Sequence, residues 1–229
     1  SEAGRLPGTV GGELILKESY IYPIAGTQEL GRDPLDAIMN ALSGVSARDG
    51  IGVQIMLRPA TGKWQNKLKE FVKKRRLQGM TDSEFKITGR DLFNAVAKDP
   101  DQINKKHERE VNQLTELQQH VLQAIEQKAQ KPGYETLIRI LVSTDNAQKS
   151  QKLLNDVVAS FALYNAPAMN SFKLLPATDV SGLVTAFIFR FFPPELNQMI
   201  LGTAEMAALF HLPDSQFSPN SDVARQYSK

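Results

Sequence analysis

Apolar and polar residues follow one pattern that occurs twice along this chain. An apolar strand leads into an amphipathic helix, which leads into another apolar strand. The two copies occupy 13–24, 33–44 and 51–58, and then 134–143, 145–164 and 184–192. Two such units predict an α+β fold of ferredoxin-like type, a split βαβ sandwich whose helices cover one face of an antiparallel sheet. This fold serves many unrelated functions, so it does not by itself indicate an activity.

Turn and capping residues delimit these elements. Asp33 is a suitable N-cap and Pro34 suits the first position of the first helix. Asp49 and Gly50 form a turn before the next strand, and the Ser-Thr-Asp sequence at 143–145 is expected to cap the second helix. Three smaller elements are expected as well: a short strand at 171–175, a turn at 179–182 and a closing helix at 202–210.

Residues 60–132 interrupt the repeat and predict a helical insertion between the two halves. Its three helices are expected at 61–77, 88–98 and 101–130. The longest is polar except for one apolar stripe, whose members are candidate partner contacts: Val111, Leu114, Leu117, Val121 and Ile125. In one interpretation this stripe packs on the domain itself. In the other it meets a second subunit, although it does not sustain the three or four heptads of a coiled coil.

These elements divide the chain into five parts. They are a lead-in at 1–12, a first βαβ half at 13–59, the insertion at 60–132, a second βαβ half with the closing helix at 133–213, and a flexible tail or linker at 214–229.

Charge is nearly balanced over the whole chain, with a formal net charge of +2, which argues against a wholly basic nucleic-acid binder. One segment is strongly basic, with Glu70 as its only acidic residue. Its cations are candidate contacts for nucleic-acid phosphates or anionic lipid: Arg58, Lys63, Lys67, Lys69, Lys73, Lys74, Arg75 and Arg76. Trp64 and Phe71 could stack or anchor there. The alternative is a solvated basic face with both aromatic rings in the core.

Catalytic and metal-binding patterns are missing from the sequence. The chain has no cysteine, which excludes disulfides, thiolate zinc sites and a thiol nucleophile. The Thr-Gly-Lys sequence at 61–63 is not a phosphate loop, because Trp64 replaces the required Ser or Thr and Leu57 replaces a glycine. His107, His120 and His211 are too scattered for a metal site. We therefore expect a non-enzyme without a catalytic residue, metal, cofactor or small-molecule substrate.

No stretch reaches the roughly 20 apolar residues that span a bilayer. The closest run, 183–192, is short and contains Arg190. The chain starts without Met and without an apolar signal region, so we expect a fragment of a longer protein.

Four segments carry a family resemblance: 5–24, 52–65, 153–173 and 200–213. They resemble the soluble domain found beside bacterial type IV secretion, or conjugative DNA-transfer, ATPases of the HerA/FtsK-like class, which are well represented in candidate-phyla bacteria. Together they cover most of the chain outside the insertion.

The resemblance implies an N-terminal, non-catalytic assembly and interaction domain whose motor would follow Lys229. It implies a cytoplasmic location, at the inner face of the membrane through segments outside this chain. Expected partners are other secretion-system subunits, the downstream motor domain and a second copy of the chain. The alternative function is a module that binds nucleic acid or an anionic membrane through the basic helix at 63–76. A stand-alone enzyme is a further rival that no constellation of residues supports.

Overall fold

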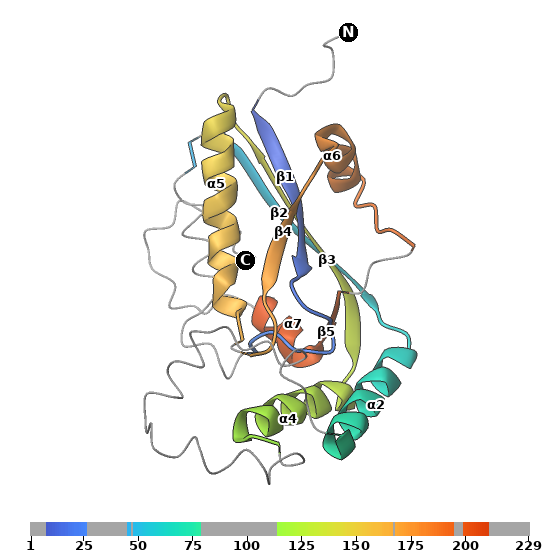
Figure 1. Ribbon diagram of the computed structural model, residues 1–229. Coiled ribbons are helices and arrows are strands. Elements are labelled where there is room, and N and C mark those ends of the chain that lie inside the picture. The colour runs from blue at the N-terminus through green and yellow to red at the C-terminus, as the bar shows by residue number, and fades with distance from the viewer. Residues whose placement is uncertain are drawn as a thin grey trace, which may run out of the picture.

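The computed structural model describes residues 8–26, 45–46, 48–78, 114–166, 168–194 and 199–210. An antiparallel sheet forms its centre (Figure 1). The strands are β1 Thr9–Leu16, β2 Gly50–Pro59, β3 Gly133–Ser143, β4 Phe172–Pro176 and β5 Ile200–Gly202. Four of them lie in the order β2-β3-β1-β4, each antiparallel to its neighbours, and β5 pairs with the first residues of β3. This order confirms the predicted ferredoxin-like α+β class.

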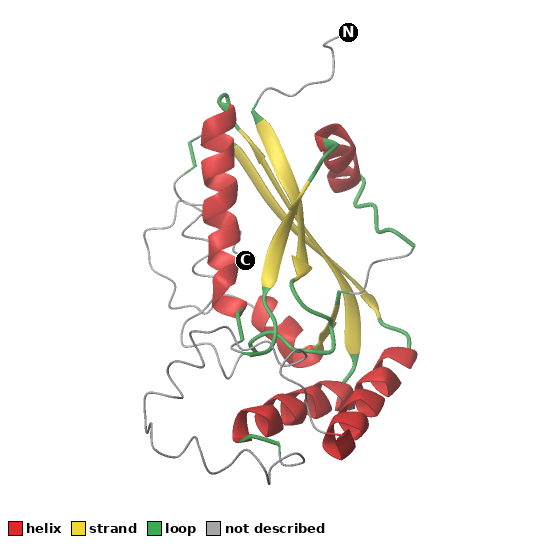
Figure 2. Ribbon diagram, in the orientation of Figure 1, coloured by secondary structure: helices red, strands yellow, loops and turns green. Residues whose placement is uncertain are grey.

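Helices cover both faces of the sheet and one of its ends (Figures 1 and 2), so the predicted coverage of one face alone is wrong. They are α2 Lys63–Gln78, α4 Glu116–Gln130, α5 Ala147–Ser160, the 3₁₀ turn η2 Phe161–Tyr164, α6 Val180–Ile188 and α7 Thr203–Leu209. The α5 helix lies on one face and α6 on the other, while α2 and α4 pack side by side beyond the end of the strands.

The main core lies between the sheet and α5. Alternation in β3 turns Ile138, Ile140 and Val142 to this side, and all three are fully buried. From the helix side, Leu154 and Val157 complete the same cluster. Burial of these five side chains removes them almost completely from water, which stabilises the sandwich by about 1.5–3 kcal/mol per residue.

The opposite face of the sheet receives α6 because two strands lack side chains there. A Cβ atom on Gly52 would lie 2.6 Å from Cζ of Phe187, and one on Gly11 would lie 2.8 Å from Cδ2 of Leu183. Leu183 and Phe187 are one helical turn apart, so both glycines meet the same side of α6. Any larger residue at these positions would push the helix away from the sheet.

A buried ion pair connects α4 to α7. The Nζ atom of Lys128 lies 2.9 Å from Oε2 of Glu205 and donates to the carbonyl of Tyr20 at 2.7 Å. Glu205 also accepts the N–H groups of Ile24 and Gly202, at 2.9 and 2.6 Å. Burial lowers the pKa of Lys128, and the Glu205 carboxylate opposes that shift. Four segments of the chain therefore meet at one charged centre.

The strand predicted at 184–192 is wrong, because most of this segment forms α6. Asp179 caps the helix by accepting the N–H of Gly182 at 3.0 Å. The composition of this segment favours a strand, but packing against the distant glycines of β1 and β2 favours a helix. These contacts cannot be seen in the local sequence. The fourth strand is instead β4, which matches the short strand predicted at 171–175.

The first strand is shorter than the predicted 13–24 and begins earlier, since β1 runs from Thr9 to Leu16. Residues 9–12 of the predicted lead-in therefore belong to the sheet, where they pair with β3. The apolar residues Tyr20 and Ile24 are buried in a loop instead. The side chain of Asn170 donates to the carbonyls of Ser19 and Tyr22, both at 2.9 Å, and holds this loop in place. The apolar residues between Leu16 and Ile24 therefore indicate burial correctly, but the strand predicted for them is wrong.

Helix starts differ from the predictions in two places. The α4 helix begins at Glu116 with a capping box between Thr115 and Gln118, rather than continuing from residue 101. The cap of α5 is Asn146, which accepts the N–H of Gln148 at 2.8 Å, and not the sequence at 143–145. The predictions for 51–58, 61–77, 134–143 and 202–210 match β2, α2, β3 and α7 closely. Those for 33–44, 88–98, 101–113 and 214–229 lie outside the described residues.

Candidate interaction surfaces

Three large apolar side chains project into solvent at the end of α6. Ile188, Phe189 and Phe191 are 67%, 77% and 56% exposed. We call these three residues the α6 surface. Exposed apolar side chains this close together in the sequence make the end of α6 a candidate contact surface.

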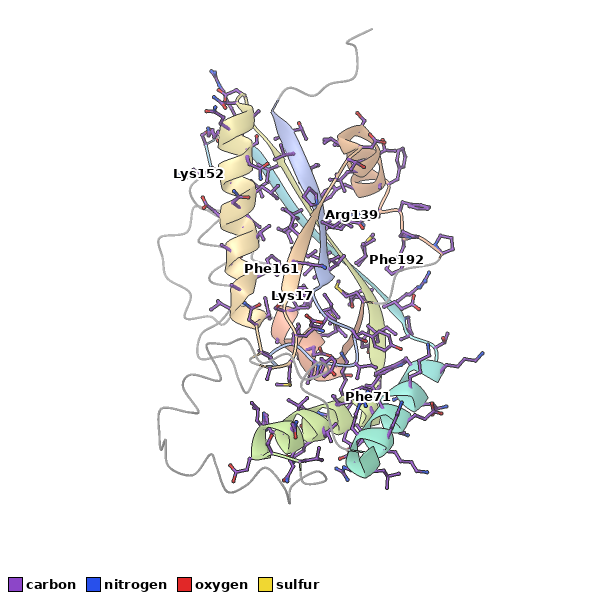
Figure 3. All side chains as sticks on the ribbon, viewed as in Figure 1. Lys17, Phe71, Arg139, Lys152, Phe161 and Phe192 are labelled. Atoms are coloured by element: carbon purple, nitrogen blue, oxygen red, sulfur yellow. The ribbon has the colours of Figure 1, made fainter. Side chains whose placement is uncertain are left out.

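The backbone beneath the α6 surface is held by a buried arginine. Arg139 of β3 is 2% exposed, and its Nη1 donates to the carbonyls of Ala186 and Phe191 at 3.2 and 2.7 Å. Its Nε donates to Glu13 of β1 at 3.0 Å, which pairs the charge. Figure 3 shows Arg139 on the side of the sheet that carries α6, with Phe161 on the α5 side.

Two residues of β2 extend this attachment. Gln54 donates to the carbonyl of Phe187 at 2.9 Å. Arg58 donates to the carbonyls of Pro193 and Pro194 at 3.2 and 2.7 Å, pairs with Glu135, and lies 4.7 Å from the centre of the Phe192 ring. The backbone that carries the α6 surface is therefore hydrogen-bonded to side chains of β2 and β3. Exposure here does not come from a loosely attached segment.

Arg190 ends α6 in a conformation that usually belongs to glycine, with φ at +51°. Its N–H donates to Phe187 at 3.3 Å, and the N–H of Phe191 donates to Ala186 at 2.9 Å. These two bonds form a Schellman motif, in which Gly is the usual residue at this position. The exposed Arg190 side chain lies between Phe189 and Phe191 in the sequence.

The residues of the predicted basic cluster have different surroundings in the structure. Arg58 binds the α6 segment as described. Arg76 pairs with Glu126 of α4 at 2.7 Å, and the guanidinium of Arg75 lies 5.1 Å from the Phe71 ring centre. The remaining five cations, all on α2, are exposed: Lys63, Lys67, Lys69, Lys73 and Lys74.

The aromatic residues of α2 face inward. Trp64 is 4% exposed, and Phe71 packs edge-on against Tyr22 with ring centres 5.8 Å apart. Neither ring is placed on the solvent face, which agrees with the alternative of a solvated basic face.

The apolar stripe of the long helix packs mainly within the domain. Val121 and Ile125 are completely buried against the core, and Leu114 is partly buried against it. Leu117 is 40% exposed, and Val111 lies outside the described residues. At Val121 and Ile125 the stripe therefore packs on the domain itself. These two side chains are not accessible to a second subunit in this structure.

A hollow of about 550 Å³ lies beside the buried ion pair, between α4 and the start of α7. Its walls consist largely of small residues, including Gly26, Ala124 and Ala204. Lys128 and Glu205 border it, but their polar atoms already bond to protein groups. The other polar residues of the lining are Gln127, Lys131 and Thr203.

Two further findings concern only the described residues. His120 is exposed on α4, and no group of three potential metal ligands occurs in those ranges; His107 and His211 fall outside them. None of the described helices is both long and apolar enough to cross a membrane.

Comparison with known proteins leaves a single assignment. Neither the curated proteins nor the solved structures give a match to this chain. A family model matches residues 7–225, which is nearly the whole sequence. The chain therefore belongs to the DUF8128 family, which is described as a domain of unknown function.

Proposed function

We propose that this chain is a non-catalytic assembly domain of a type IV secretion, or conjugative transfer, ATPase, and that its partner at the α6 surface is the motor domain of that ATPase. The observation that supports binding is the rigid exposure of Ile188, Phe189 and Phe191. The secretion assignment rests on the sequence resemblance described above. The motor domain would then follow Lys229, and segments outside this chain would hold the assembly at the inner face of the membrane.

The α6 surface can supply substantial binding energy. Complete burial of a Phe or Ile side chain is worth about 1.5–3 kcal/mol. Because these three side chains are more than half exposed, covering them would gain roughly 3–6 kcal/mol. The attachment to Arg139, Gln54 and Arg58 fixes the backbone beforehand, so less conformational entropy is lost on binding.

Arg190 indicates the chemistry of the partner. Its left-handed conformation costs on the order of 1 kcal/mol relative to glycine. An arginine at this position is therefore not explained by stability of the helix end. A carboxylate on the partner could pair with Arg190, and apolar groups around that carboxylate could pack on Phe189 and Phe191.

The test is a calorimetric titration of this chain with the separately purified motor domain from the same reading frame. Phe189→Ser should weaken binding by at least about tenfold, since one anchor side chain is worth more than 1.4 kcal/mol. Arg190→Gly should weaken binding while it raises the melting temperature, because it removes the strained conformation and the charge together. Leu163→Ser, at an exposed apolar residue outside the α6 surface, is the matched control. Unchanged affinity of both α6 variants would refute docking through this surface.

A further inference from the structure

The exposed lysines of α2 fall into two rows. At 100° per residue, Trp64, Leu68 and Val72 point to the core. One flank of the helix then carries Lys63, Lys67 and Lys74, and the opposite flank carries Lys69, Lys73 and Arg76. Between the flanks, the outermost strip of the helix consists of Asn66, Glu70 and Leu77, and Lys63 and Lys73 border it about 20° further round on either side.

Solvent reaches both rows. The five lysines are exposed, and within the described part of the chain Arg76 is the member of the two rows that pairs with an acidic residue of a neighbouring helix, Glu126. The row that faces α4 borders an open cleft of about 320 Å³, lined by Lys69, Lys73 and Arg76 among others. Figure 1 shows α2 at an edge of the molecule, beside α4 and beyond the end of the sheet.

The arrangement matches the two phosphate backbones that border one groove of a DNA duplex. An α-helix with its side chains is about 10–12 Å wide, and the major groove of B-DNA is about 12 Å wide. Lysines on the two flanks would then reach phosphates of opposite strands. Along the helix, Lys63 and Lys74 are separated by about 16 Å, at about 1.5 Å per residue.

We propose that α2 binds duplex DNA without sequence preference, through lysine–phosphate contacts on both sides of the major groove. The strip that would face the bases offers one amide, Asn66, so the lysine–phosphate contacts on its two sides outnumber the base contacts. Glu70 lies in that strip and would be repelled by the phosphates. This inference concerns a different surface from the α6 surface and does not depend on the secretion assignment.

Two other polyanions fit the geometry less well. A flat anionic membrane would meet the outer strip with Glu70 first, and Trp64, the residue best suited to anchor in a lipid interface, is buried. Duplex RNA has a deep and narrow major groove that a helix cannot enter. Binding should therefore favour a DNA duplex over an RNA duplex of the same sequence and over phosphatidylserine-containing vesicles.

The test uses fluorescence anisotropy of the full chain with a short DNA duplex over a range of salt concentrations. Five lysine contacts predict a slope of log affinity against log salt of about −4.5, at about −0.9 per phosphate. Affinity should then fall about 500-fold between about 50 and 200 mM salt. Replacing Lys63, Lys67 and Lys74 together by Gln should reduce the slope to about −1.8, since three contacts are lost. Glu70→Gln should strengthen binding.

A variant with the same loss of charge elsewhere provides the control. Lys17, Lys152 and Lys173 are exposed on other elements, and Figure 3 shows the first two away from α2. Their joint replacement by Gln should leave the slope unchanged. The proposal is overturned if this control weakens binding as much as the α2 variant, if vesicles or duplex RNA bind more tightly than DNA, or if the wild-type chain does not bind DNA at low salt.

Discussion

Replacing Lys128 by Met should remove a large part of the stability of this fold. Met keeps most of the volume of the lysine stem but has no charge and no donor. Glu205 would then keep a buried negative charge with only the N–H groups of Ile24 and Gly202 as partners. The carbonyl of Tyr20 would lose the Lys128 donor at 2.7 Å.

The burial of the pair determines the magnitude. The side chains of Lys128 and Glu205 are 3% and 4% exposed, so a charge left unpaired there is poorly solvated. Removal of one member of such a pair typically costs about 3–5 kcal/mol. Domains of this size have a free energy of unfolding of about 5–15 kcal/mol, so the variant should remain folded but become marginal.

The assay is urea unfolding followed by the fluorescence of Trp64, which is the only tryptophan and is buried between α2 and β3. Glu205→Gln and the double variant complete a thermodynamic cycle. Because the second replacement removes the charge left unpaired by the first, the double variant should be about 2–3 kcal/mol more stable than the sum of the single losses predicts. Arg76→Met breaks the exposed pair with Glu126 and should cost less than about 1 kcal/mol.

Two results would refute this reasoning. A loss below about 1 kcal/mol for Lys128→Met would mean that the charge of Glu205 is not left unpaired in a buried site. Strict additivity of the two single variants would mean that Lys128 and Glu205 do not interact energetically.

Two further predictions concern the attachment of α6 and a carboxylate near β2. Arg139→Met removes donors to the carbonyls of Ala186 and Phe191, so hydrogen exchange at 183–191 should accelerate by at least about tenfold while β3 stays protected; equal protection in both proteins would contradict the attachment. Bonds from Lys149 and then Ser46 lower the pKa of Asp49 below 3.8, so its stabilising effect is present above pH 3.8 and is lost as the pH falls through the lowered value. Carboxyl NMR should show this pKa rising in Lys149→Gln, and an unchanged midpoint would exclude Lys149 as the main cause.

The sequence predicted those elements whose local signals agree. The β3 strand combines alternation with the Pro132-Gly133 sequence that stops the helix before it, and β2 follows the Asp49-Gly50 turn. In α2, three apolar residues at helical spacing face the core. In these elements the hydrophobic periodicity, the residue propensities and the turn residues all favour the same secondary structure. Tertiary contacts therefore agree with the local preference and do not change it.

The α6 segment shows why other elements could not be predicted. Its Val, Ile and Phe residues favour a strand, but Gly11, Gly52 and Arg139 make room for a helix and hold it. Those residues are about 50 to 170 positions away along the chain, and only the folded sheet brings them together. One signal was present in the sequence: an arginine at position 139 in the middle of a buried strand requires a polar partner on that face.

One of the two candidate surfaces could be predicted from the sequence and the other could not. Charge density identified α2 from composition alone, but helix geometry was needed to separate its five exposed lysines from Arg58 and Arg76. The sequence does not indicate the α6 surface, because the composition of residues 184–192 predicts a strand. Its exposure follows from the helical conformation, which turns Leu183 and Phe187 to the sheet and Ile188 and Phe189 to solvent.

The most direct test of the proposed function is the coding sequence downstream of Lys229 in the parent gene. Our account predicts that the same reading frame continues into a motor domain with a G-x-x-x-x-G-K-[ST] loop after a strand. A reading frame that continues without such a loop, or that stops soon after Lys229, would contradict the assignment to a secretion ATPase.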